Sequence, residues 1–108
     1  MIDWDRAEEL RQEVGDEDFG EIVAMFLEEA DSVLLRLVAC DSAKCLESGL
    51  HFLKGSALNL GFSSLAQICQ AGERAAAAGI TDVPMDEVVS VYTKSRAHFL
   101  TQLEASAA

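Results

Sequence analysis

Apolar residues recur along the whole chain at the three- and four-residue spacing of helices that bury one face. The longest stripe is formed by Phe19, Ile22, Val23, Phe26, Leu27, Ala30, Val33, Leu34, Leu37 and Val38. An α-helix completes a turn every ~3.6 residues, so this spacing places the whole stripe on one side of one helix. A shorter stripe over residues 4–14 precedes it, and others follow over residues 46–60, 65–76 and 85–103. The pattern therefore predicts four long helices with a short helix before them.

Residues that start or stop helices mark the ends of these stripes. Gly15 closes the first stripe, and the acidic residues 16–18 suit the positive end of a new helix. Asp41 or Ser42 can cap the third helix, and Gly61 ends it. The remaining signals are the capping-box pair Ser64 and Gln67, then Gly79, then Pro84 in a first helical turn. Because the connections are short, the expected fold class is all-α, an antiparallel up-and-down four-helix bundle with a short additional N-terminal helix.

Composition fits a single helical domain over residues 1–108 without a membrane segment. The chain is half apolar with a single Pro, and charges interrupt its apolar stretches. Its first residues, MIDWDRAEEL, lack the basic start and apolar run of a signal peptide. The cysteines Cys40, Cys45 and Cys69 form no CxxC pair, so we expect them to be small apolar side chains. These features predict a protein of the reducing cytoplasm, and we expect a monomer.

The negative charge is concentrated in the first third of the chain. The formal net charge is −11, and residues 1–31 contribute −10 of it, with twelve acids against Arg6 and Arg11. Residues 32–108 contribute only −1. Such a surface repels phosphate backbones and anionic lipids, so we expect neither a nucleic-acid partner nor a membrane partner. The simplest interpretation of the acidic run is a solvated helix face that keeps the domain soluble.

A histidine occupies the middle of the polar face of the third predicted helix. At about 100° per residue, the apolar side chains gather on the side opposite His51; they are Leu46, Leu50, Leu53, Ala57 and Leu60. The residues that share the face of the histidine are Lys44, Glu47, Ser48, Lys54, Gly55, Leu58 and Asn59. Leu58 has no core to join there. We therefore expect His51 to be exposed on a surface that meets a partner.

The spacing His51-x-x-Lys54-Gly55 suits the transfer of a phosphoryl group. Histidine is a good reversible nucleophile near neutral pH, because much of it is unprotonated there. Lys54 lies one turn away, where its ammonium can pair with phosphate oxygens. Gly55 weakens the helix by about 1 kcal/mol relative to Ala, but it removes the side chain that would stand beside the imidazole. The spacing alone leaves open that His51 is an incidental surface residue.

The stretch HFLKGS, residues 51–56, followed by Leu60-Gly61-Phe62, resembles the signature of histidine-containing phosphotransfer (HPt) domains of two-component phosphorelays. The likeness extends to VGDEDFGEIVAMFLEEADSVLLRL before it and LAQICQAGERAA after it, which is most of the chain. The resemblance implies a four-helix bundle whose exposed histidine accepts a phosphoryl group from one receiver-domain aspartate and donates it to another. It implies that His51 is phosphorylated, that Lys54 steadies the phosphoryl group, and that Gly55 provides clearance.

The resemblance also implies a mechanism and a set of partners. Nε2 of His51 would attack the aspartyl phosphate in line, while the receiver domain supplies Mg²⁺, so we expect no cofactor on this chain. The sequence has no nucleotide-binding glycine loop, so autonomous kinase activity is not expected. The expected partners are response-regulator receiver domains and a sensor histidine kinase, which can be a hybrid kinase. The residues expected to meet them are Lys44, Glu47, Ser48, Leu58, Asn59, Phe62, Gln70 and Arg74.

Some assignments stay open on sequence alone. Glu47 could orient the imidazole or be a solvated neighbour. The following helix offers Gln70, Glu73 and Arg74, and the sequence does not indicate which of these faces the histidine.

Two other classes of function are also open. One is a metal-binding bundle built on His51, His98 and carboxylates, although neither histidine follows a Glu by three residues as such sites require. The other is a module that is not phosphorylated and that binds and inhibits a kinase or receiver.

Overall fold

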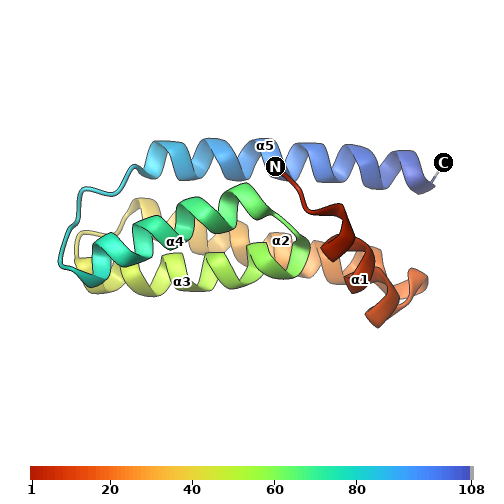
Figure 1. Ribbon diagram of the computed structural model, residues 1–108, viewed down its shortest axis with the longest axis horizontal. Coiled ribbons are helices and arrows are strands. Elements are labelled where there is room, and N and C mark those ends of the chain that lie inside the picture. The colour runs from red at the N-terminus through yellow and green to blue at the C-terminus, as the bar shows by residue number, and fades with distance from the viewer. Residues whose placement is uncertain (108) are drawn as a thin grey trace.

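The computed structural model describes residues 1–107 and places 84% of these residues in helices. The helices are α1 (Trp4–Val14), α2 (Asp16–Val38), α3 (Ala43–Leu60), α4 (Ser63–Ala77) and α5 (Met85–Ala107). Figure 1 shows α2, α3, α4 and α5 lying alongside one another, with α1 crossing one end of the bundle at an angle. The molecule is elongated, with extents of 45 × 22 × 21 Å. The predicted all-α bundle with a short N-terminal helix is confirmed.

Local capping signals set the ends of α3. Ser42 is the N-cap residue, and its hydroxyl accepts a hydrogen bond of 3.2 Å from the backbone N–H of Cys45. At the other end, Gly61 adopts the left-handed conformation with φ of 85°, and its N–H donates to the carbonyl of Ala57. A residue with a Cβ is strained in this conformation, which explains why glycine ends the helix. The sequence therefore fixes both ends of the helix that carries His51.

The capping box predicted at Ser64 and Gln67 is wrong. Helix α4 begins one residue earlier, at Ser63, and its N-cap position is Phe62, which makes no side-chain capping bond. The N-terminal segment binds the start of α4 instead. The Ser63 hydroxyl donates a hydrogen bond of 2.9 Å to the carbonyl of Met1, and the backbone N–H of Ser64 donates to the same carbonyl at 3.2 Å. A contact distant in sequence has thus replaced the local cap.

Two glycines let neighbouring helices approach α3 closely. A Cβ added at Gly49 of α3 would overlap the side chain of Leu37 on α2. A Cβ at Gly72 of α4 would lie 2.9 Å from Leu50 Cδ1 on α3. Such distances are shorter than real Cβ contacts, so a larger residue at either position would force the neighbouring leucine side chain to shift, and glycine lets the helices pack without that shift. The close approach at Gly72 also brings the next residue, Glu73, to the surface of α3.

The expectation that all three cysteines are small apolar side chains in a reducing environment is wrong for two of them. Cys40 and Cys45 form a disulfide across the connection between α2 and α3, with Cα atoms 5.8 Å apart. Cys69 is free and fully buried in the core, as expected for a small apolar side chain. Burial raises the pKa of the Cys69 thiol to about 12, and the nearby Glu73 charge adds to the effect. The turn after α2 brings the first two cysteines together although their spacing is not CxxC.

Within residues 1–107, no helix combines the length and the apolar character that crossing a membrane would require.

Candidate functional site

His51 projects from the middle of α3 into solvent, with 70% of its side chain exposed. The predicted core stripe on the opposite side of α3 is buried; it consists of Leu46, Leu50, Leu53, Ala57 and Leu60. The expected orientation of the helix is therefore confirmed. An imidazole in this position can be reached by a second protein without any change in the bundle.

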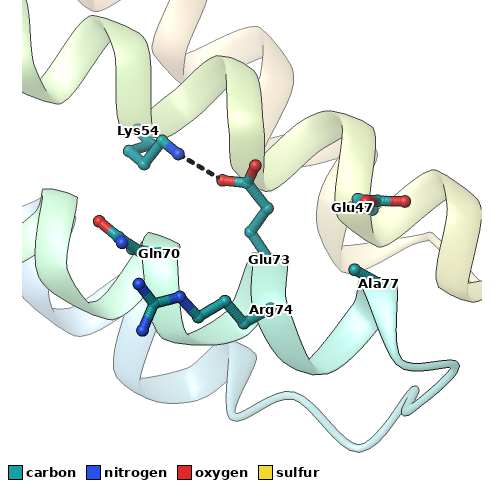
Figure 2. A pocket seen from close by; sticks show the side chains of 6 residues that line it. All are labelled: Glu47, Lys54, Gln70, Glu73, Arg74 and Ala77. Carbon is teal, nitrogen blue, oxygen red and sulfur yellow. Dashed lines mark ion pairs between the residues drawn. The ribbon is translucent and has the colours of Figure 1, made fainter.

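A carboxylate from α4 lies between His51 and Lys54. Glu73 Oε1 is 2.8 Å from Nδ1 of His51, and Glu73 Oε2 is 2.8 Å from Nζ of Lys54. Figure 2 shows this ion pair joining the two helices. The side chain of Lys54 folds over toward α4 and is only 22% exposed, so it is more buried than its place on the polar face predicts. One side chain of α4 thus holds both polar groups of the His-x-x-Lys motif.

The contacts of Glu73 fix its charge and the position of a proton on His51. The hydrogen bond from Lys54 is the main cause that lowers the pKa of Glu73, and the hydrogen bond from His51 acts in the same direction against the opposing effect of burial. The carboxylate is therefore ionised at neutral pH and can only accept hydrogen bonds. Nδ1 of His51 must then carry the proton that it donates, which leaves Nε2 of the neutral ring with a free lone pair.

A small cavity of about 160 Å³ lies between α3 and α4 beside the Lys54–Glu73 pair. Its lining residues are Glu47, Lys54, Gln70, Glu73, Arg74 and Ala77, drawn in Figure 2. Gln70 and Arg74 are exposed, whereas Glu47 is partly buried. The cavity therefore gathers two cations, an amide and two carboxylates, and one of these carboxylates, Glu73, contacts His51.

The surface beside His51 is open at Gly55. A Cβ built there meets no atom within 4 Å. Packing therefore gives no reason for a glycine at this position, in contrast to Gly49 and Gly72. The role of Gly55 as a clearance for a partner stays a prediction, because Gly20 of α2 is equally open.

The residues predicted to bind partners fall into two groups. Lys44, Ser48, Leu58 and Asn59 are exposed on α3, and Leu58 keeps 56% of its surface accessible. The placement of Phe62 on this surface is wrong. Phe62 is 1% exposed and packs edge-on against Phe99, with the two ring centroids 5.4 Å apart. The chain turns inward after α3 ends, so its aromatic ring joins the core.

Sequence reasoning left open which acid orients the imidazole. The residue in contact with Nδ1 of His51 is Glu73, which is 22 positions away in sequence. Glu47, on the same helix as His51, lines the cavity between α3 and α4 instead. Two signals could have favoured Glu73. It is the single acid among residues 63–77, and it directly follows the glycine at which α4 approaches α3.

His98 lies apart from this site. It is exposed on α5, and the centroid of its ring is 5.8 Å from that of the Trp4 ring. Among the residues that the structure describes, no group of three or more His, Cys, Asp or Glu side chains is placed to hold a metal ion.

Comparison with known proteins agrees with this geometry. A family model described as the Hpt domain matches residues 21–107, so the chain belongs to the family of Hpt domains, phosphoryl carriers of two-component systems. A solved structure with the same fold is histidine-containing phosphotransfer protein B (HptB) from Pseudomonas aeruginosa PAO1. The two chains are 22% identical, the match covers 96% of this chain and 95% of that one, and the TM-score is 0.86. A search of curated proteins gave no significant match.

Proposed function

We propose that this domain is a phosphorelay intermediate in which His51 accepts a phosphoryl group from a receiver-domain aspartate and passes it to another receiver. The observation that carries the proposal is the contact between Nδ1 of His51 and Glu73 at 2.8 Å. It leaves Nε2 as the nucleophilic atom of a side chain that is 70% exposed.

The expected mechanism requires few catalytic groups from this domain. Phosphoryl transfer is catalysed mainly by positioning and electrostatics, and the receiver supplies Mg²⁺ and most of the charge stabilisation. Lys54 supplies a cation one turn from His51. Its ammonium has three donors, so it can hold Glu73 and a phosphoryl oxygen at the same time. Gly55 leaves the space through which the aspartate of the receiver approaches in line.

The receiver is expected to dock on the exposed face of α3 and the neighbouring edge of α4. Leu58 offers an apolar contact there, and the surrounding polar residues are Lys44, Glu47, Ser48, Asn59, Gln70 and Arg74. Asn59 Oδ1 is 3.5 Å from Nη2 of Arg6, so α1 borders this face. The proposed partners are response-regulator receivers and a sensor histidine kinase, with no cofactor bound by this chain.

A labelling experiment tests the assignment of His51. The domain is incubated with phosphorylated receivers of its own organism, and His51→Gln is compared with His98→Gln as the matched control, because both histidines are exposed. We expect an acid-labile, base-stable phosphate on the wild type and on His98→Gln, and none on His51→Gln. Persistent labelling of His51→Gln would contradict the assignment. A domain that binds receivers without ever acquiring phosphate would instead be an inhibitory module.

A further inference from the structure

Glu73 is the group that decides where the proton of His51 resides. One carboxylate oxygen is 2.8 Å from Nδ1, and the other is 2.8 Å from the ammonium of Lys54. Glu73 is 20% exposed and Lys54 is 22% exposed, so water screens this pair much less than it screens the imidazole. The arrangement exists before any phosphoryl group arrives, and nothing in it depends on a partner.

We infer that Glu73 is a positioning residue that keeps the proton on Nδ1 after His51 is phosphorylated, so that the phosphorylated ring stays cationic and ready to give up its phosphoryl group. The inference rests on the proposed function above and concerns the chemical state of the carrier between its two transfers.

The bonds and charges of the transfer balance without movement of a proton. When Nε2 attacks, the N–P bond forms and the P–O bond to the aspartate breaks, and its electron pair leaves on the receiver carboxylate. The ring keeps its Nδ1 proton and gains one positive charge, which the negative charge of the released carboxylate matches. In the next transfer the N–P electron pair returns to Nε2, and the ring leaves as neutral imidazole. A phosphorylated ring without the Nδ1 proton would have to leave as an imidazolate anion, a far poorer leaving group.

Charged groups from both helices surround the Lys54–Glu73 pair beside the ring. In the cavity next to this pair, α3 contributes Lys54 and Glu47, and α4 contributes Glu73 and Arg74, with Gln70 as a neutral residue. Lys54 opposes a second positive charge nearby, but its ammonium is already paired with Glu73. Glu73 is the group at hydrogen-bond distance from Nδ1. The direct hydrogen bond to an ionised acceptor therefore decides the balance in favour of the protonated ring.

The test measures how fast the phosphorylated domain loses its phosphate as a function of pH. Phosphoramidate, a small chemical donor, loads the protein without a receiver, and a His98→Gln background confines the label to His51. The rate of loss falls where the ring loses its Nδ1 proton. In Glu73→Gln this inflection should move to lower pH by about one unit, so that loss becomes about tenfold slower above it, because an opposite charge within hydrogen-bond distance favours the protonated form.

Two further variants are included, one expected to shift the inflection in the opposite direction and one that serves as a control. Lys54→Met removes the opposing cation and should move the inflection to higher pH. Glu104→Gln makes the same charge change as Glu73→Gln at an exposed position on α5 and should leave the inflection where it is. In the ¹⁵N spectrum of the phosphorylated wild type, Nδ1 should carry a proton at neutral pH.

The inference is overturned if the wild type and Glu73→Gln share one inflection, or if Nδ1 of the phosphorylated wild type has no proton at neutral pH. If Glu73→Gln fails to fold, Lys54→Met and the wild-type spectrum still decide the matter. Failure of the proposed function has a different signature, because the chemically loaded domain would then show these shifts while exchanging no phosphate with any receiver.

Discussion

Replacing Gly55 with Gln separates helix stability from phosphotransfer. Gly55 lies in the interior of α3, where glycine weakens a helix by about 1 kcal/mol relative to good helix formers. A Cβ there meets no atom within 4 Å, so a longer side chain enters without a clash. We therefore expect the free energy of unfolding of Gly55→Gln to stay unchanged or to rise by up to about 1 kcal/mol. For a domain of this size that gain raises Tm by about 4–8 °C.

Phosphotransfer should change in the opposite direction. The Gln side chain stands one turn from His51, on the path by which the aspartate of a receiver reaches Nε2 in line. Misplacement of the reacting atoms by even ~1 Å reduces rates by on the order of a hundredfold, and this is the loss expected for Gly55→Gln. A thermal melt gives the stability, and a time course with a phosphorylated receiver gives the rate.

Other glycines of the chain provide matched controls. Gly20 of α2 also has nothing within 4 Å of a built Cβ, so Gly20→Gln should gain similar stability without slowing transfer. Gly72→Ala should lose stability, because its Cβ would crowd Leu50. If Gly55→Gln melted at a lower temperature than the wild type, the glycine would serve packing. If the variant transferred phosphate at the normal rate, the clearance argument would be refuted.

Two further predictions concern Lys54 and the disulfide. Lys54→Met keeps most of the partly buried side-chain stem and removes the ammonium. Transfer from a phosphorylated receiver should therefore slow by about 10- to 100-fold, which is the rate equivalent of one hydrogen bond to a charged group. An unchanged transfer rate in a time course would contradict the proposed contact between Lys54 and the phosphoryl group. Reducing the Cys40–Cys45 bond should lower the free energy of unfolding by about 2 kcal/mol, as estimated for so short a closed loop, in urea titrations with and without reductant. Cys40→Ser is the control, since reductant should not affect it, and equal midpoints for the oxidised and reduced wild type would contradict the estimate.

The sequence determines the part of the site that lies on one helix. Lys54 and Gly55 follow His51 by three and four residues. The fixed rise and turn of an α-helix place residues with these spacings on one face, wherever the helix packs. The apolar stripe then decides which face meets solvent, and Ser42 and Gly61 decide where the helix starts and stops. All of these signals act within a few residues, so periodicity and capping rules were sufficient to find them.

Only the tertiary structure decided which groups from elsewhere join that face. Glu73 reaches His51 because α4 packs closely on α3 at Gly72, and the rotation and axial shift between two helices depend on side-chain packing that no local pattern records. The tertiary structure also decided the position of Phe62. This residue lies beyond the end of α3, where helical periodicity no longer predicts the direction of a side chain, and after the turn at Gly61 it is buried in the core. The turn after α2 likewise brings Cys40 to Cys45. Spacing within a helix is set by backbone geometry, whereas contacts between elements are set by how the whole bundle fills its core.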